Sequence, residues 1–263
     1  MRGNGTVARI NIAPVKGTRL VHPTEVKLER FGVPENRRFH LVNGKDRLFS
    51  GTRHGPLVAL VSSYDPEREW LEVEFPDGSV AAGRADLLGD PVSTVMWGRE
   101  IPGHVALGPW SEAISRRVGE PVRLIRSDRP GDGVDSHAAS IVGTASVAEL
   151  GRRANRDGPL DARRFRMLVE IDGLEPHEED TWIGSAVRIG EAAVRVIRPD
   201  PRCVVTERDP ETGLPDFDTR KAILAYRPSP DRDANFGVYA DVIEPGTVAV
   251  GDAAHVLEGS VGK

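Results

Sequence analysis

The sequence predicts an α+β fold that is rich in β-structure. Short alternating segments separated by turn residues fill the first third of the chain, and no ten-residue helical period occurs before residue 108. Helical patterns then alternate with further strands. The 28 glycines and 20 prolines are spread along the chain, which is typical of many turns between short strands. We therefore expect a small β-barrel or sandwich over residues 1–100 and an α+β domain with a mostly antiparallel sheet over residues 105–260.

The strands expected in the first domain alternate or form short apolar runs bounded by turn residues. The clearest signal is a hairpin: Trp70–Phe75 alternates, meets a Pro-Asp-Gly turn, and the pattern resumes at Ser79–Ala81. The other strands of this domain are expected at Thr6–Ile12, Glu25–Leu28, Arg38–Val42, Leu57–Ser62 and Val92–Trp97.

Three helices are expected after residue 108. Apolar residues recur at i, i+4 and i+8 over Trp110–Val118, and the glycine that follows favours a helix ending there. Ser146 and Glu149 have the spacing of a capping box at the start of a second helix. A third helix is expected over Thr219–Tyr226, with Asp218 as its N-cap and a proline just beyond its end.

The strands of the second domain include two expected hairpins. One joins Val187–Ile189 to Ala192–Ile197 through a two-residue loop, and the other joins Val238–Ile243 to Thr247–Val250 through a Pro-Gly turn. Glycines and prolines cluster near residues 98–108, where we expect the domain boundary. Further strands are expected at Pro121–Arg126 and Arg166–Ile171.

Composition excludes several classes of protein. With 35 basic and 40 acidic side chains, the formal net charge is −5 at pH 7, which provides no overall field for nucleic acid. The single cysteine excludes an internal disulfide, a cysteine-rich zinc site and an iron–sulfur cluster held by this chain alone. No run approaches 18 apolar residues, and Met1–Gly5 does not resemble a signal peptide. We expect a soluble cytoplasmic protein that binds neither nucleic acid nor membrane.

Motifs for several common cofactors and reactions are missing from the sequence. The seven histidines show no HxH, HExxH or HxxxH spacing, which argues against a zinc site. There is no P-loop and no GxGxxG after a strand, and pyridoxal phosphate is not expected. The absence of GxSxG weakens an α/β-hydrolase interpretation. The cysteine and the basic residues are therefore the main candidates for chemistry.

The single cysteine, Cys203, directly follows a β-like segment. A lone free thiol is commonly buried and inert, packed as a small hydrophobe. Pro199 and Pro201 cannot donate ladder hydrogen bonds, which places the cysteine at a strand edge or rim. Arg198 and Arg202 favour a thiolate, the form that attacks electrophiles and binds soft metals. From these residues alone, Cys203 could be either a buried residue of the core or a reactive thiol.

Basic residues gather at the ends of expected strands. Arg37 and Arg38 precede one strand. Lys16 follows an Ala-Pro-Val segment, and a basic run over Asp161–Arg166 leads into another strand. A solvated face or ordinary salt bridges would explain any one of these clusters. Together they could instead converge on an anionic ligand such as a phosphate.

Several segments follow one another in a recognisable order along nearly the whole chain: Ile12–Gly17, Arg37–Val42, Gly51–Arg53, Thr144–Leu150, Ala162–Arg166, Arg202–Thr206, Asp209–Gly213 and Pro245–Asp252. In this order they resemble the MOSC proteins, named for the molybdenum cofactor sulfurase C-terminal domain. The closer similarity is to members with an N-terminal MOSC β-barrel domain, among them bacterial single-chain proteins and the mitochondrial amidoxime reducing component. The resemblance implies that β-barrel-like domain over residues 1–100. It also implies a MOSC domain, a mostly antiparallel β-barrel with a few helices, over residues 105–260.

The resemblance further implies a molybdenum cofactor held between the two domains. Cys203 matches the cysteine that supplies a thiolate to molybdenum. Lys16 and Arg38 match positions that hold the cofactor's phosphate, and Asp135 and Ser136 match an Asp-Thr/Ser pair beside the metal. These residue types suit the group, because a soft thiolate binds molybdenum well and fixed cationic donors bind a phosphate.

Three positions depart from the family pattern. Arg166 matches the arginine of a Phe-Arg-Pro-Asn segment and is expected to neutralise charge on the cofactor, but Met167-Leu168 replace the Pro-Asn. Pro201 replaces a serine two residues before the cysteine. His137 stands where a small residue is usual, either as a proton donor to substrate or as a packing substitution.

The leading hypothesis is a molybdenum-cofactor oxidoreductase that reduces small N-oxygenated molecules, namely N-hydroxylated bases, amidoximes or N-oxides. Asp135 is the candidate for substrate orientation or proton relay. The chain has no motif for flavin, haem or an iron–sulfur cluster, so electrons are expected from a separate ferredoxin, flavoprotein or cytochrome-type protein. Two alternatives stay open: a sulfur carrier that holds a persulfide on Cys203, and a binding module without catalysis.

Overall fold

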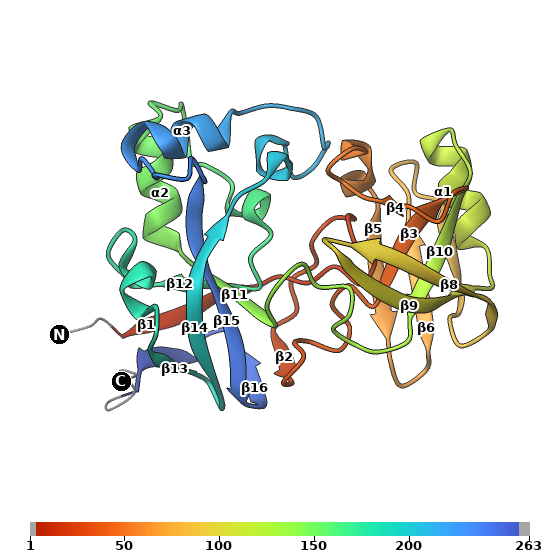
Figure 1. The fold of residues 1–263 in the computed structure, drawn as a ribbon, viewed down its shortest axis with the longest axis horizontal. Helices are drawn as coiled ribbons and strands as arrows, with labels where there is room; N and C mark the ends of the chain where they lie inside the picture. Colours follow the sequence, from red (N-terminus) through yellow and green to blue (C-terminus); the bar gives the residue numbers. More distant parts are fainter. Residues whose placement is uncertain (1–3, 258–263) are drawn as a thin grey trace.

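The computed structural model describes residues 4–257 and shows two units side by side (Figure 1). One contains a closed barrel of strands and both ends of the described chain, and we call it the barrel unit; the other, the two-sheet unit, contains β3 to β10 and α1. The predicted β-rich α+β fold is confirmed. None of the helices in the described range has the length and hydropathy of a membrane-spanning segment. Within residues 4–257 the α-helices are α1 (Trp110–Val118), α2 (Thr144–Arg153) and α3 (Thr219–Tyr226).

The barrel is closed by strands in the order β1-β12-β11-β15-β14-β13-β17. Neighbouring strands are antiparallel except β11 and β12, which are parallel. Successive side chains of a strand point to opposite faces, and the inward set is apolar, with Ile141, Val194 and Val238 fully buried. The strands are β1 (Gly5–Ile10), β11 (Ala139–Gly143), β12 (Val169–Asp172), β13 (Ala186–Ile189), β14 (Ala192–Pro201), β15 (Asn235–Glu244) and β17 (Ala253–Val256).

The first strand of the chain belongs to the barrel. β1 pairs with β12 and β17, and its Val7 and Ile10 are buried in the barrel core. β2 (Glu25–Leu28) pairs with β16 (Gly246–Ala249), so it too lies with the C-terminal part of the chain. The structure therefore differs from the expected domain over residues 1–100. The chain starts in the barrel unit, and the strand series of the other unit begins only at β3.

The two-sheet unit packs two sheets around one apolar core. The five-stranded sheet has the order β4-β3-β10-β9-β8, and the three-stranded sheet has the order β5-β6-β7. Helix α1 adds Trp110 and Ile114 to this core, where both are fully buried. The strands are β3 (Phe39–Asn43), β4 (Leu48–Phe49), β5 (Val61–Asp65), β6 (Trp70–Glu74), β7 (Val80–Arg84), β8 (Leu88–Met96), β9 (Arg99–Ala106) and β10 (Val122–Ser127).

The division between the units also differs from the one expected near residues 98–108. β10 pairs with both β3 and β9, so the strand expected to open the second domain lies in the two-sheet unit. The glycines and prolines of the expected boundary fall in the turn before β9, within that strand, and in the short segment between β9 and α1. We place the division after Ser127.

Several predicted elements are confirmed. β6 and β7 form the predicted hairpin, and β13 and β14 form another through the Gly190-Glu191 loop. Helix α1 ends at Gly119 in a left-handed conformation, which a glycine adopts without strain. The Asp218 side chain accepts a hydrogen bond from the Lys221 backbone and caps α3.

Four local predictions are wrong. Residues 57–62 are not one strand, because a 3-10 turn over Gly55–Ala59 precedes β5. β16 pairs with β2 instead of forming a hairpin with β15. The strand expected from Arg166 begins at Val169, since Arg166 is left-handed at the end of a 3-10 turn. Ser146 lies inside α2, and its hydroxyl donates to the buried Glu179 instead of capping the helix.

Candidate functional site

A cavity of about 440 Å³ lies where the two units meet. The two-sheet unit contributes Trp97, in the turn between β8 and β9, and Arg37 lies just before β3. The barrel unit contributes Asp135, ahead of β11, and Cys203, after β14. Lys16 comes from the segment between β1 and β2. The cavity therefore exists only where both units are folded against each other.

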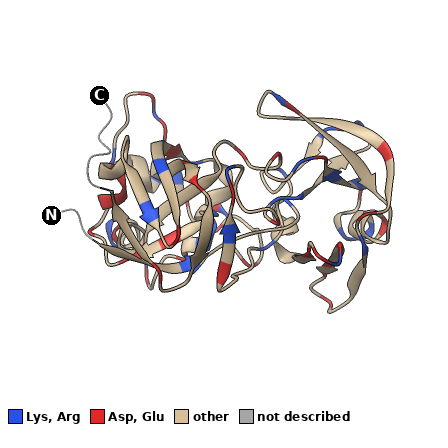
Figure 2. Cartoon of the chain, turned by 90° about the horizontal axis from the view of Figure 1, so that it is seen from below, with Lys and Arg blue, Asp and Glu red and all other residues tan. Residues whose placement is uncertain are grey.

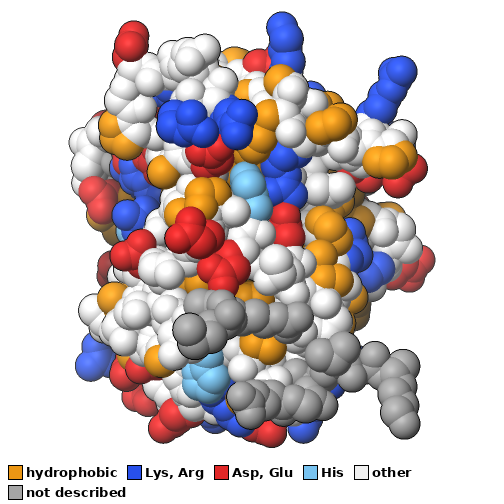
Figure 3. Space-filling model, turned by 90° about the vertical axis from the view of Figure 1, so that its left-hand side faces the viewer, with side chains coloured by type: hydrophobic (Ala, Val, Ile, Leu, Met, Phe, Trp, Pro, Cys, Tyr) orange, Lys and Arg blue, Asp and Glu red, His pale blue; other side chains and the backbone are white. Residues whose placement is uncertain are grey.

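The lining of this cavity is strongly cationic. Within the described range, nine lysine or arginine residues line it, against the three acidic residues Asp135, Asp200 and Asp209. Figure 2 shows Lys and Arg on the loops where the units meet, whereas the face in Figure 3 mixes acidic, basic and small apolar areas. Such an excess, in a chain of net charge −5, favours an anionic ligand. The cations are Lys16, Arg19, Arg37, Arg163, Arg164, Arg166, Arg198, Arg202 and Arg208.

Asp135 is held by three side chains from separate segments. Its Oδ1 accepts hydrogen bonds from Lys16 Nζ at 2.6 Å and from Trp97 Nε1 at 2.9 Å. Its Oδ2 accepts from Arg37 Nη1 at 2.5 Å. Lys16 Nζ also donates to the Gly133 carbonyl at 2.9 Å. The carboxylate therefore fixes two cations and one indole around the same wall of the cavity.

Burial and charge act against each other in this cluster. Burial lowers the pKa of Lys16 to about 8, although the Asp135 carboxylate raises it. Burial also lowers the pKa of Arg166 to about 10, and Arg37 adds to that effect. For Asp135, burial would raise the pKa, but Arg37 and Lys16 outweigh it and hold that pKa far below its usual range. Asp135 is thus a permanent carboxylate at neutral pH.

Three side chains of the cavity sit on strained backbone. Arg37, Trp97 and Arg166 have φ of 56°, 52° and 55°, in the left-handed region that glycine prefers. A residue other than glycine in this region costs on the order of 1–3 kcal/mol, and such residues concentrate at functional sites. Trp97 and the following Gly98 form a two-residue turn with two positive φ angles, which suits the twist of the β8–β9 hairpin.

Cys203 lies two residues after β14, at the N-cap position of a short 3-10 turn over Val204–Glu207. Pairing between β14 and β15 continues only to Pro201, after which the chain leaves the sheet, as the prolines predict. The thiol is exposed and lines the cavity. The interpretation of this residue as a buried, inert cysteine is therefore wrong.

The arginines that flank the cysteine have their own partners. Arg202 pairs with the buried Asp200. Arg198 Nη2 donates to Ser136 Oγ at 3.0 Å, and its guanidinium lies 5.0 Å from the centre of the Tyr239 ring. Ser136, predicted from the sequence to bind the cofactor, is thus in the cavity wall and held by an arginine.

Arg38 is not where the sequence interpretation placed it. In the described structure it lies outside the cavity lining, is buried, and donates to the Ser127 carbonyl. Burial, with Arg126 as the second cause, lowers its pKa. Its neighbour Arg37, whose backbone is in the left-handed conformation, reaches the cavity instead. A phosphate in the cavity would therefore meet Arg37 rather than Arg38.

Arg166 and His137 complete the predicted set. Arg166 Nη2 donates to the Thr18 carbonyl at 2.8 Å and so links the barrel unit to the segment that carries Lys16. His137 Nδ1 lies 2.8 Å from Asp241 Oδ1 on β15. The structure thus brings six of the seven residues singled out above to one cavity. They are Lys16, Asp135, Ser136, His137, Arg166 and Cys203.

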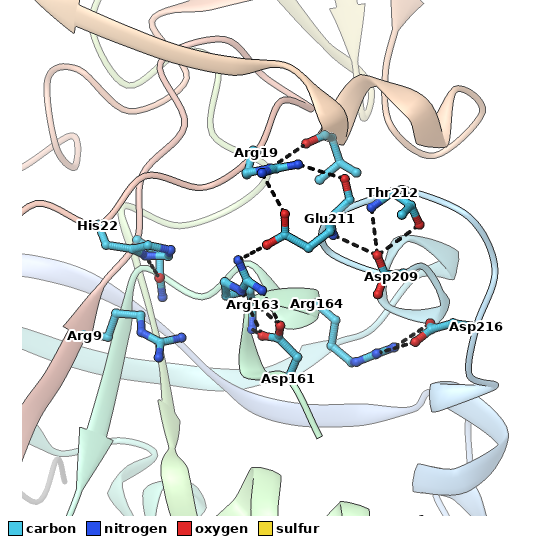
Figure 4. A network of polar contacts seen from close by, with 12 residues as sticks. Arg9, Arg19, His22, Asp161, Arg163, Arg164, Asp209, Glu211, Thr212 and Asp216 are labelled. Carbon is cyan, nitrogen blue, oxygen red and sulfur yellow. Dashed lines mark hydrogen bonds and ion pairs between the residues drawn. The ribbon is translucent and has the colours of Figure 1, made fainter. Parts of the chain in front are cut away.

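A chain of ion pairs borders the cavity (Figure 4). Glu211 lies between Arg19 and Arg163, at 2.7 Å and 2.5 Å, and Arg163 also pairs with Asp161 at 2.6 Å. The backbone of Arg19 forms a bridge with Val61 of the two-sheet unit, so this network connects the units. It fixes the positions of two cavity cations.

Sequence reasoning missed two residues of the cavity lining, Trp97 and Tyr239, and the partner of His137, Asp241. Trp97 stood at the end of an expected strand, directly before Gly98, and a large aromatic side chain in a tight turn is a detectable signal. Tyr239 and Asp241 carry no such signal, because they lie in an ordinary alternating strand whose neighbours are distant in the sequence. Their place at the site depends on tertiary pairing.

The side chains that line the cavity suit a metal whose cofactor supplies most of its ligands. Within residues 4–257 no group of three or more histidine, cysteine, aspartate or glutamate side chains could hold a metal ion. One exposed thiol lies in the cavity, among cationic side chains. This arrangement suits an anionic cofactor that needs a single soft protein ligand.

Comparison with known proteins identifies the two parts of the chain. The model of the MOSC N-terminal beta barrel domain matches residues 4–116, and the model of the MOSC domain matches residues 128–255. The human mitochondrial amidoxime reducing component 2 is 32% identical, over 95% of this chain and 83% of its own length. The human mitochondrial amidoxime-reducing component 1 is 25% identical, over 96% of this chain and 83% of its own length. Among solved structures, the YUAD protein from Bacillus subtilis is 14% identical with a TM-score of 0.46, covering 96% of this chain and 95% of its own.

Proposed function

We propose a function from one premise: the chain belongs to the MOSC proteins that carry an N-terminal MOSC β-barrel domain. The proposed function is a molybdenum-cofactor-dependent oxidoreductase that reduces N-oxygenated small molecules with electrons from a separate protein. One observation carries it: the exposed Cys203 thiol lies in a cavity that both units form and that nine cationic side chains line. The names of the relatives support the reaction class, since they are called amidoxime-reducing components.

The residues present are suited to hold such a cofactor. A Cys203 thiolate would be the protein's ligand to molybdenum. Lys16, Arg37 and Arg166 would face the phosphate, because all three line the cavity and a guanidinium offers paired donors to phosphate oxygens. Bound there, a molybdenum cofactor would supply the two-electron redox chemistry of oxygen-atom transfer.

Asp135 serves in this proposal as a positioning residue. Both of its oxygens accept hydrogen bonds from cavity residues, and its pKa lies far below the usual range because of Arg37 and Lys16. It therefore holds Lys16, Arg37 and Trp97 in place, and it does not donate a proton. This favours the orienting half of the expected role over the proton relay.

The electron donor and the compartment are predictions of the same proposal. The donor would be a separate ferredoxin, flavoprotein or cytochrome-type protein, and the substrate a small N-hydroxylated base, amidoxime or N-oxide. The relatives are named as mitochondrial proteins, and a cytoplasmic location for this chain stays a prediction.

The test is metal and pterin analysis of the chain purified from a host that makes the cofactor. We expect close to one molybdenum per chain, lost in Cys203→Ala, and reduction of a model amidoxime with a chemical reductant, lost in the same variant. Metal-free wild-type protein that releases sulfur on cyanide treatment would instead support a persulfide carrier. Molybdenum that stays bound in Cys203→Ala, with reduction intact, would show that the cysteine is assigned wrongly.

A further inference from the structure

The proposed reaction needs a proton source that Asp135 cannot supply. Breaking the N–O bond of an N-hydroxylated substrate takes up two electrons and two protons, forms an N–H bond and releases the oxygen as water. The two electrons come from the separate electron-donor protein through the cofactor. Asp135 is ionised and both of its oxygens are occupied by donors. The proton for the substrate nitrogen must therefore come from another group that lines the cavity or from solvent.

His137 has the geometry of such a group. It lies in the segment that leads into β11, it lines the cavity, and 18% of its side chain is exposed. Its Nδ1 lies 2.8 Å from Asp241 Oδ1. A carboxylate can only accept, so Nδ1 donates this hydrogen bond and the ring presents Nε2 as its second nitrogen. Within residues 4–257, Nε2 has no hydrogen-bond partner, and it is not sealed from solvent.

The groups around His137 favour it over its neighbours as the acid. From β15, Asp241 pairs with the ring and Tyr239 lies 5.2 Å away between ring centres. Burial raises the pKa of Tyr239 above its usual range, and Asp200 adds to this, so the phenol does not ionise near neutral pH. From β14, Arg198 is engaged with Tyr239 and with the Ser136 hydroxyl. Imidazole is the one side-chain type among these that can both accept and release a proton through a ring nitrogen, and Nε2 is the nitrogen left open by the pair with Asp241.

We propose that His137 is a catalytic residue that delivers a proton from Nε2 to the substrate nitrogen as the N–O bond breaks, with Asp241 as its positioning residue. This inference rests on the proposed function. The second proton comes from solvent and leaves with the oxygen as water. His137 then regains its proton from solvent through the cavity. Asp241 fixes the ring orientation and stabilises the imidazolium.

The test uses the full chain loaded with cofactor, reduced methyl viologen as the electron source and benzamidoxime as the substrate. kcat is measured from pH 5 to 9, per bound molybdenum, for the wild type, His137→Ala, His137→Gln and Asp241→Asn. His104→Ala is the matched control, because His104 forms a similar pair with Asp128 at 2.9 Å but lies outside the cavity lining. The ring tautomer of His137 is read separately by NMR on the unloaded chain.

We expect kcat to fall at least about 100-fold in both His137 variants, the usual contribution of a positioned acid. In the wild type, kcat should fall as pH rises, because the acid must be protonated. This fall of kcat with rising pH should be absent in the His137 variants and should occur at lower pH in Asp241→Asn, with KM little changed. Added imidazole should restore part of the rate to His137→Ala, and His104→Ala should behave as the wild type.

Two results would overturn the role of His137. One is a His137→Ala chain that keeps the wild-type kcat per molybdenum and the same fall of kcat with rising pH. The other is a neutral ring that carries its proton on Nε2 in the NMR measurement, since this excludes donation from Nδ1 to Asp241. A loaded wild type that reduces no N-oxygenated compound would refute the proposed function itself, and the role of His137 with it.

Discussion

The buried lysine of the cavity gives a pH dependence that can be worked out in advance. The pKa of Lys16 is about 8 in the folded chain against 10.5 for an ordinary lysine, because burial disfavours the ammonium. At about 1.4 kcal/mol for each unit of this difference, the charged lysine reduces the stability of the fold by about 3 kcal/mol. The unfolded chain binds this proton more tightly, so the free energy of unfolding rises with pH between about 8 and 10.5. Below pH 8 the full cost is present, and above 10.5 it is gone.

The measurement compares the wild type with Lys16→Met by urea unfolding at pH 7, 8, 9 and 10. Other groups titrate in both proteins, so the difference between their unfolding free energies isolates Lys16. This difference should change by about 2–3 kcal/mol in favour of the wild type between pH 7 and 10. The matched control is Lys45→Met, at an exposed position, for which the difference should stay flat.

Phosphate links the same measurement to function. An anion in the cavity favours the charged form of Lys16, so inorganic phosphate should reduce the pH-dependent difference. A difference between wild type and Lys16→Met that stays constant from pH 7 to 10 would refute the reasoning. In that case the Asp135 carboxylate would compensate fully for the burial of the ammonium.

Three further substitutions test the packing described above by urea unfolding. In Gly213→Ala the new Cβ would lie 1.9 Å from the Gly55 carbonyl oxygen at a φ of 72°, so we expect the free energy of unfolding to fall by about 2 kcal/mol or more. The control is Gly78→Ala, where φ is 81° but no atom lies within 4 Å of the new Cβ, and its free energy of unfolding should fall less. Equal losses in the two variants would contradict the clash. Trp110→Ala should cost about 3–5 kcal/mol, because the ring is fully buried; a loss below 1 kcal/mol would contradict its place in the core. Glu211→Gln should cost at most about 1 kcal/mol, since that side chain is 45% exposed, and a larger loss would show a tighter link between the units.

Local patterns in the sequence predicted most of the strands but not their partners. The alternation of β1 is visible, yet its partners are β12 and β17, more than 150 residues away. Nothing in a period of two says which distant strand shares a ladder. For the same reason the final hairpin was predicted wrongly, because β16 pairs with β2. The expected division of the chain depended on these pairings and differs from the structure for the same reason.

The candidate site was predictable where chemistry identifies a residue by type. Cys203 stands out by type as the single thiol, whereas the roles of Lys16, Asp135 and Ser136 were indicated only by the family resemblance. The choice between Arg37 and Arg38 was not predictable, because it depends on the tertiary contacts that bury Arg38 against the Ser127 carbonyl. The sequence shows two adjacent cations, and only the fold decides that one faces the cavity.

The unfavourable features of this protein concentrate at one place. Arg37, Trp97 and Arg166 carry backbone strain, and Lys16 carries a charge that burial disfavours, all within the lining of one cavity. Two apolar cores offset these costs, and neither of them needs the strained residues. A fold selected for stability alone would lose such features, since a Gly at any of the three positions would relieve the strain. An anion bound among these cations would recover part of the cost, so a cofactor that binds only the folded chain should stabilise the contact between the two units.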